Sequence, residues 1–199
     1  EATRDKIMAY ANDIAAKLSG KMFGDEKVRV KVDARNKESM DKGWEWVRKG
    51  APLVCEVGVR DMEKNGLVLK TRIKINTPDW KQVVSVSDFT ETISERLDAI
   101  QNEMFETAKK RLMGNIRTDI GSAAEMREYF SGNNAFIDSA EKPVAFVRGK
   151  WCGDPETEEM LKEMKISIRC IPEDQSGTVG KCLLTDKEAT LDVIYARSY

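Results

Sequence analysis

The feature of this sequence that most constrains its fold is a pair of alternating segments separated by an Asn-Gly dipeptide. Residues 52–61 (PLVCEVGVRD) and 66–75 (GLVLKTRIKI) alternate apolar with polar side chains, the period of a half-buried strand. Asn65-Gly66 lies between them, and this dipeptide is the strongest short-range signal for a hairpin turn. The two segments are therefore predicted to form an antiparallel hairpin.

The segments before this hairpin predict an α/β unit. Residues 3–18 carry apolar side chains at helical spacing, residues 27–35 alternate valines with charged residues, and residues 41–50 form a short helix or turn. The expected order is helix, strand, helix, strand, strand. In such an α/β sandwich a first strand normally precedes the opening helix, so we expect this unit to lack its first strand through N-terminal truncation.

A long amphipathic segment follows at residues 87–113, with one apolar stripe at helical spacing. Beyond it the pattern predicts helices at 122–131 and 155–165 and strands at 142–152, 165–172 and the C-terminal end. The fold class is therefore α/β, with two α/β units joined by a long helix. We expect residues 1–86 to form the first domain, and residues 87–199 to hold the linking helix and a smaller second domain.

Charge is divided unevenly between the two parts. Residues 1–81 hold 18 Lys and Arg against 13 Asp and Glu, a net charge of +5, whereas residues 82–199 hold 15 against 21, a net charge of −6. A basic first part indicates that a polyanionic partner would bind there. Drift of surface charge explains the same numbers without any partner.

Several classes of function are excluded by composition. The chain has no histidine, which removes Ser-His and Cys-His nucleophilic dyads and any zinc site with imidazole ligands. No apolar stretch approaches the roughly 20 residues that cross a bilayer, so no membrane partner is expected. Four cysteines without a secretory signal are typical of reduced thiols and a cytoplasmic location.

Two motif sets identify the chain. The first unit contains the frame Trp46-x-x-Lys49-Gly50-x-Pro52-x-x-x-Glu56-x-Gly58-x-Arg60-Asp61, and the second contains WCGDP at 151–155, IRCIP at 168–172, GKC at 180–182 and the terminal YARSY. The first set resembles the anticodon-binding domain of class II aminoacyl-tRNA synthetases, specifically prolyl-tRNA synthetase of the archaeal/eukaryotic-like type. The second set resembles the C-terminal zinc-binding-like domain of the same family.

The resemblance implies the tRNA-recognition portion of a prolyl-tRNA synthetase. The parent enzyme of such a portion ligates proline to tRNA(Pro), uses ATP with Mg²⁺, and releases AMP and pyrophosphate. The ATP-binding motifs of class II catalytic domains are absent here, so no catalytic residue and no cofactor of its own are expected in this fragment. The implied partners are the tRNA(Pro) anticodon loop and the enzyme's own catalytic domain, within a homodimeric parent; DNA is not expected.

Candidate tRNA-binding residues lie on the strands and the helix of the first unit. Arginine and lysine can bind phosphates or guanine edges, glutamate can accept from a base amino group, and tryptophan can stack on an unpaired base. The candidates are Trp46, Arg48, Lys49, Glu56, Arg60, Lys70 and Arg72. Core packing of the tryptophan and simple solvation of the charged residues would explain the same pattern.

The first unit also departs from the family frame at three positions. Val47 stands where the family has Glu, Val54 where it has Arg, and Val59 where it has Pro. Because valine cannot make a bidentate polar contact, either neighbours such as Arg48 replace the lost contacts or base reading is weakened. The alternative function is therefore a synthetase-like relic that serves as a protein-interaction or structural module without anticodon specificity.

The second unit departs from its family at the zinc site. The family uses two cysteine pairs, which correspond here to Cys152 with Thr157 and Cys182 with Thr185, so each pair has lost one member. Two thiols do not complete a structural zinc cage, and we expect these positions to be vestigial. The family also implies that the terminal Tyr199 contacts the catalytic domain.

Overall fold

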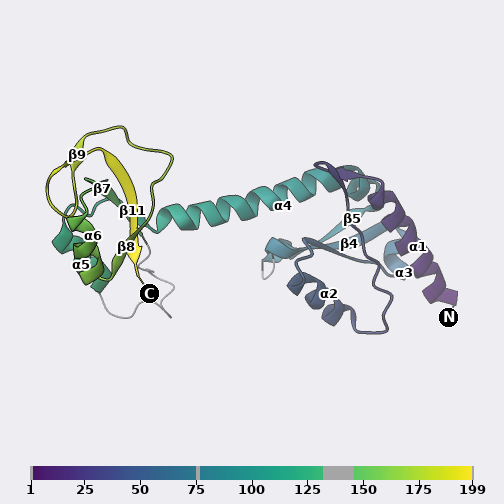
Figure 1. Ribbon diagram of the computed structural model, residues 1–199. Helices are drawn as coiled ribbons and strands as arrows, with labels where there is room; N and C mark the ends of the chain where they lie inside the picture. The colour runs from purple at the N-terminus through teal and green to yellow at the C-terminus, as the bar shows by residue number, and fades with distance from the viewer. Residues whose placement is uncertain (1, 75–76, 132–145, 199) are drawn as a thin grey trace. The chain divides into compact units, whose positions relative to one another are not determined.

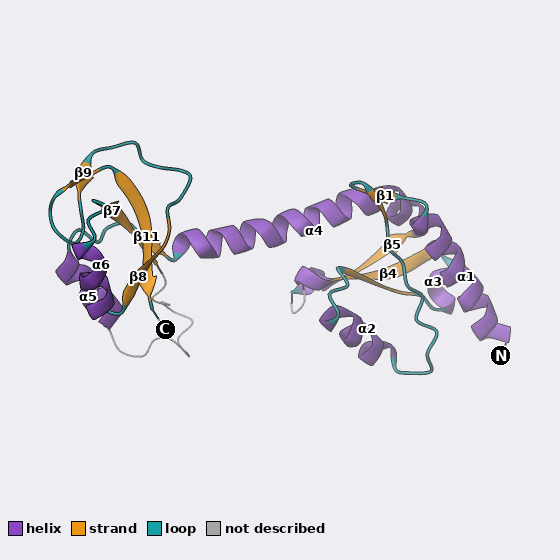
Figure 2. Ribbon diagram, viewed as in Figure 1, coloured by secondary structure: helices purple, strands orange, loops and turns teal. Residues whose placement is uncertain are grey.

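The computed structural model describes residues 2–74, 77–131 and 146–198, and the chain divides into two compact units between residues 106 and 107. The boundary falls inside the long helix α4 (Val86–Gly114) (Figure 1). Each unit combines helices with its own small sheet (Figure 2), which confirms the mixed α/β class. Within these described ranges, no helix is both long and apolar enough to cross a membrane.

The first unit is built on a three-stranded antiparallel sheet in the order β3-β4-β5. Its strands are flanked by helices and short turns. The elements are α1 (Ala2–Ser19), β1 (Met22–Phe23), β2 (Glu26–Lys27), α2 (Ser39–Arg48), β3 (Leu53–Glu56), α3 (Val59–Glu63), β4 (Gly66–Thr71), η1 (Arg72–Lys74), η2 (Pro78–Trp80), β5 (Lys81–Ser85) and the first part of α4.

The two faces of this sheet serve different purposes. One face holds the core, where Leu67 and Leu69 of β4 are fully buried against Leu18 of α1 and against Phe89 and Ile93 of α4. Helix α2 lies beside the other side of the sheet (Figure 1). The apolar stripe that predicted the long helix therefore supplies the core of this unit through its first two turns.

The pairing of the two alternating segments is confirmed, but their connection is different from the predicted turn. β3 and β4 are antiparallel, with Leu53 opposite Thr71, and the five-residue helix α3 lies between them. Asp61 accepts a hydrogen bond of 2.9 Å from the backbone N–H of Gly58 and so caps this helix. Asn65 adopts a left-handed conformation (φ 48°) that ends it.

The predicted strand over residues 27–35 is wrong for most of its length. Only Glu26–Lys27 is a strand, paired with Met22–Phe23. Alternation identifies which valines turn inward, and Val28 does pack against the core. A strand also needs a neighbour that satisfies its backbone groups, and residues 28–35 pair with no strand in the described part of the chain.

The second unit is built on a four-stranded sheet in the order β6-β7-β11-β8. Val193 and Tyr195 of the central strand β11 are fully buried and pack with Met126 and Leu161 of two helices. The predicted helices and strands of this unit are present, although the first four residues of the strand predicted at 142–152 lie outside the described ranges. The elements are β6 (Ile116–Arg117), α5 (Ala123–Ser131), β7 (Phe146–Trp151), α6 (Glu156–Glu163), β8 (Ile166–Cys170), β9 (Gly180–Lys181), β10 (Glu188–Ala189) and β11 (Leu191–Arg197).

A buried carboxylate ties β7 to β11 and to the loop before β9. Asp192 lies 2.8 Å from the ammonium of Lys150 and 3.1 Å from the guanidinium of Arg148, and it accepts a hydrogen bond of 2.7 Å from the backbone N–H of Ser176. Burial opposes ionisation of Asp192, but these three donors outweigh it and hold the pKa of the carboxyl well below its usual range.

Candidate nucleic-acid interface

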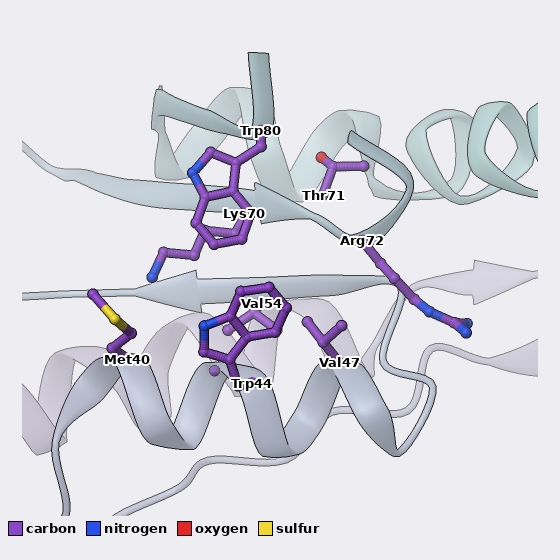
Figure 3. Close-up of a pocket in the computed structure, with 9 residues that line it drawn as sticks. Met40, Trp44, Val47, Val54, Lys70, Thr71, Arg72 and Trp80 are labelled. Atoms are coloured by element: carbon purple, nitrogen blue, oxygen red, sulfur yellow. The ribbon is translucent and has the colours of Figure 1, made fainter. Parts of the chain in front are cut away.

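The side chains that converge in the first unit come from one face of the β3–β4 pair and from helix α2. Val54 lies directly opposite Lys70 in the ladder, and Glu56 shares their face because it is two residues further along β3. Helix α2 presents Trp44 and Val47 to this face (Figure 3). Together they form a cleft that encloses only about 10 Å³, lined by Met40, Gly43, Trp44, Val47, Val54, Lys70, Thr71, Arg72 and Trp80.

Two tryptophans form the walls of this cleft. The ring centroids of Trp44 and Trp80 are 5.9 Å apart and their planes are inclined by 34°, and the two rings lie side by side (Figure 3). The ammonium nitrogens of Lys70 and Lys81 lie 5.5 and 5.3 Å from the centroid of the Trp80 ring. This is the range of cation–π attraction, which fixes Trp80 between two positive charges.

An ion pair neutralises the lysine inside the cleft. Lys70 is 7% exposed and donates a hydrogen bond to Glu56 Oε1, which also accepts one of 2.6 Å from the hydroxyl of Ser39. Burial opposes ionisation of Glu56, but these two hydrogen bonds lower the pKa of its carboxyl below the ordinary value. Glu56 therefore already compensates the positive charge of Lys70 in the absence of a ligand.

The variant Glu56→Gln is expected to lower the free energy of unfolding by about 2 kcal/mol at pH 7, because it leaves the buried ammonium of Lys70 without its carboxylate. Since the pKa of Glu56 is lowered in the folded state, this stabilisation is fully present above the usual glutamate pKa and is lost as the pH falls below it. Urea titrations at pH 7 and pH 3 measure the loss of unfolding free energy at neutral pH and test whether that loss becomes smaller in acid. Ser39→Ala, which removes a single hydrogen bond, is the control and should cost less than about 1 kcal/mol.

The seven predicted residues are not all in one place. Three of them, Glu56, Lys70 and Arg72, lie at the cleft or next to it. The indole N–H of Trp46 donates a hydrogen bond of 2.8 Å to Asp33, and the ammonium of Lys49 lies 4.8 Å from the centroid of the Trp46 ring. The remaining two, Arg48 at the end of α2 and Arg60 on α3, are exposed.

Trp46 has a structural contact of its own. Hydrogen bonds from Arg35 and then from Trp46 hold the pKa of the Asp33 carboxyl well below its usual range. Arg35 also forms an ion pair of 2.8 Å with Glu45, which lies on helix α2 beside Trp46. This network anchors α2 to the segment that precedes it, and so fixes the position of the helix that carries Trp44.

Neither tryptophan of the cleft was among the residues predicted from the sequence. A signal existed for Trp44, because it lies three residues before Val47 and therefore on the same helical face as one of the substituted positions. Trp80 lies at the end of the short turn η2 and just before β5, an element that alternation did not reveal. Its place opposite Trp44 follows only from the pairing of β5 with β4.

Two of the three valine substitutions meet in this cleft. Val47 and Val54 line it and are half-buried, whereas Val59 begins helix α3 and is 39% exposed. The two positions where the resemblance implies a polar pair therefore contribute apolar side chains to the lining of the cleft.

The four positions that the resemblance predicts to be vestigial zinc ligands make other contacts in the second unit. Thr157 is fully buried, accepts a hydrogen bond of 2.7 Å from the indole N–H of Trp151, and donates one to the backbone carbonyl of Asp154. The sulfur of Cys152 lies 3.7 Å from the hydroxyl of Thr185. Burial raises the pKa of the buried thiol of Cys182, but hydrogen bonds from Leu184, Thr185 and Cys152 outweigh it and lower that pKa.

These residues do not fit a zinc cage. Two thiols and two hydroxyls replace four thiolates, and the hydroxyl of Thr157 already has both a donor and an acceptor. Over the described ranges, no group of three or more His, Cys, Asp or Glu side chains is placed to hold a metal ion. Tyr199 lies outside the described residues.

Comparison with known proteins places this geometry in a family. Residues 2–96 match the family model described as an anticodon binding domain, which is a class of RNA-binding domain found in aminoacyl-tRNA synthetases. Residues 134–199 match the model described as the C-terminal part of prolyl-tRNA synthetase. The chain therefore belongs to the prolyl-tRNA synthetase family and carries its anticodon-binding and C-terminal domains.

Individual relatives agree with the family models. The chain is 39% identical over 197 residues to a proline–tRNA ligase of Protochlamydia amoebophila, covering 98% of this chain and 38% of that protein. It is 35% identical over 196 residues to a proline–tRNA ligase of Paramagnetospirillum magneticum, covering 97% and 37%. A crystal structure of prolyl-tRNA synthetase from Cryptosporidium parvum, complexed with L-proline and AMP, matches with a TM-score of 0.77 and 27% identity over all of this chain and 38% of that one. The chain thus spans well under half the length of these relatives.

Proposed function

We propose that this chain is the tRNA-recognition part of a proline–tRNA ligase. The whole enzyme would join proline to tRNA(Pro) and convert ATP to AMP and pyrophosphate, with ATP and Mg²⁺ bound by a catalytic domain outside these 199 residues. The proposal is supported by relatives named as proline–tRNA ligases, of which the chain matches about 38% of the length. By itself the chain would bind RNA and catalyse nothing.

The observation that carries the proposal is the cleft of the first unit. An anticodon loop offers unpaired bases that can be splayed out and stacked on aromatic side chains. The cleft combines two tryptophan walls with Arg72 in its lining and with Lys81 beside Trp80. Residues 1–86 would receive the loop at this cleft.

The remaining partners follow from the same proposal. Residues 87–199, including Tyr199, would contact the catalytic domain of the enzyme, which would function as a homodimer. All four cysteines are free thiols, which favours the reducing cytoplasm as the place of action.

A binding titration tests the proposal. Two fluorescent anticodon stem-loops would be compared at two salt concentrations, one with the proline anticodon and one with its second and third bases changed. We expect the proline loop to bind at least about tenfold more tightly, equivalent to about 1.4 kcal/mol. Equal affinities that fall steeply with salt would indicate phosphate contact alone and contradict anticodon reading.

Arg72→Gln is the variant that should report on the cleft. Because its guanidinium is the charge of the lining that Glu56 does not pair, we expect its loss to weaken binding of the proline loop about tenfold and to reduce the salt dependence by about one unit of slope. Arg29→Gln, an exposed residue of the same unit, is the matched control. Equal effects of the two variants would show that only general charge matters.

The interaction-module alternative has one structural observation in its favour, the exposure of Val59. Val47 and Val54 are turned into the cleft and so do not form an exposed apolar surface. Failure of the folded protein to bind either stem-loop would favour this alternative.

A further inference from the structure

We propose that Cys152 and Cys182 are a reversible disulfide site, which a low-molecular-weight disulfide of the glutathione class oxidises by thiol–disulfide exchange. Both residues are free thiols in this structure, and both lie in the second unit. The inference goes beyond the proposed function and does not depend on RNA binding. Disulfides of cytoplasmic proteins are usually transient and redox-sensing, so the reduced pair would be the resting state.

The fold brings the two thiols together at the end of strand β7. The backbone N–H of Leu183 donates a hydrogen bond of 3.0 Å to the carbonyl of Lys150, which places Cys182 beside the residues that end this strand. The side chain of Cys152 packs against the core cluster that contains Cys182. The hydroxyl of Thr185 lies 3.7 Å from the sulfur of Cys152 and also hydrogen-bonds with the thiol of Cys182. Because the two thiols share this partner and hydrogen-bond with each other, joining their sulfurs needs no rearrangement of the sheet.

The two thiols differ in their access to solvent. Cys152 is half-buried and lines a cleft of about 280 Å³, whose lining also includes Gly153, Glu188 and Thr190. Cys182 is only 1% exposed. A small oxidant that enters from solvent can therefore reach Cys152 and cannot reach Cys182.

Cys182 is suited to the second step of the exchange, in which a thiolate attacks a mixed disulfide. Burial raises the pKa of its thiol, but hydrogen bonds from Leu184, Thr185 and Cys152 outweigh burial and lower that pKa. The thiolate is the nucleophilic form of cysteine. Cys182 thus offers a thiolate next to the sulfur of Cys152 and shielded from solvent.

The exchange balances in two steps. The thiolate of Cys152 attacks one sulfur of glutathione disulfide, so that a mixed disulfide forms and the other half leaves as glutathione thiolate, which takes up a proton. The thiolate of Cys182 then attacks the sulfur of Cys152 and releases the second glutathione in the same way. The two protein thiols lose two electrons and two protons, and the glutathione disulfide gains both to become two glutathione thiols.

Incubation of the intact 199-residue chain with glutathione disulfide tests the proposal. Alkylation of the remaining thiols, followed by peptide mapping, should show that Cys152 and Cys182 have lost their free thiols and are joined to each other. Dithiothreitol should restore both thiols. Cys170→Ala is the matched control, because it removes an exposed thiol on β8, which β11 separates from β7. This variant should form the disulfide as the wild type does.

Two further variants separate the steps. Cys182→Ala should stop at a stable glutathione adduct on Cys152, because the attacking thiol of the second step is gone. Cys152→Ser should leave Cys182 unmodified, because its thiol is buried. Urea titration shows which variants are folded, and mapping of the wild type decides the proposal by itself.

Two results would overturn the proposal. A glutathione adduct that persists on Cys152 of the wild type, in the same yield as in Cys182→Ala, would show that the two thiols do not meet. A wild-type chain in which Cys152 stays unmodified would show that the cleft gives the oxidant no access to its sulfur. Either result would leave the proposed RNA binding of the first unit unaffected.

Discussion

Replacing Asp192 with asparagine is expected to lower the free energy of unfolding of the second unit by about 3 kcal/mol at pH 7. Asp192 is 5% exposed and is the common partner of Lys150 and Arg148. Asparagine keeps the shape and can still accept a hydrogen bond from Ser176, but it removes the charge that compensates two cations. The loss is large because those cations remain in place with little access to water.

The same variant carries a pH signature with a definite sign. The pKa of Asp192 is depressed in the folded state, so its stabilisation is fully present above the unfolded aspartate pKa of about 3.9 and is lost as the pH falls below that value. The stabilities of the wild type and of Asp192→Asn should therefore converge in acid. Urea titrations followed by the fluorescence of Trp151, the one tryptophan in residues 107–199, measure this directly.

Asp174→Asn is the control for this prediction. Asp174 pairs with Arg148 at 3.2 Å, but its side chain is 78% exposed, and pairs of that kind contribute less than about 1 kcal/mol. A loss for Asp192→Asn no larger than that of the control would show that the buried network contributes little.

Gly149→Ala is the second substitution with a large expected effect, a loss of about 2 kcal/mol from overpacking. A Cβ atom at Gly149 would lie 2.2 Å from Leu183 Cδ1 and 2.8 Å from Leu183 Cγ. Leu183 is buried in the core of the second unit, so its side chain can retreat only by disturbing its neighbours. Thermal unfolding of the purified chain measures the loss.

A double variant identifies the cause of that loss. Leu183→Ala in the Gly149→Ala background removes the clash, so the two substitutions together should cost clearly less than the sum of their separate effects. Gly114→Ala, where a Cβ would meet nothing within 4 Å, is the control and should not destabilise the chain. Additive effects would show that alanine is accommodated at position 149 without contact to Leu183.

The helices of this protein were largely predictable from sequence, and the strands less so. A period of 3.6 residues is a local property, and it located the helix at Val86–Gly114 to within one residue at each end. Strands depend on partners that sequence does not reveal. The valines of 27–35 alternate with charged residues, but residues 28–35 pair with no strand in the described part of the chain. Strand β5 was missed for the opposite reason: it is an edge strand with four of its five residues exposed, so its sequence shows no alternation.

The candidate site was predictable where it depended on strand alternation. The shared face of Glu56 and Lys70 follows from the register of two predicted strands. The pairing of those two charges and the meeting of Trp44 with Trp80 depend on tertiary packing between α2, β4 and the start of β5. Two tryptophans so far apart in the sequence carry no local signal of their contact, which explains why the aromatic walls were missed.

The contacts at the positions where the resemblance implies zinc ligands bear on how the stability of this protein depends on metal ions. A metal cage makes folding depend on the free concentration of the ion by mass action. Trp151, Thr157, Cys152 and Thr185 instead satisfy one another with groups that the chain itself supplies. The second unit should therefore keep its fold through metal starvation and in the presence of chelators, conditions that would disable a zinc-dependent counterpart.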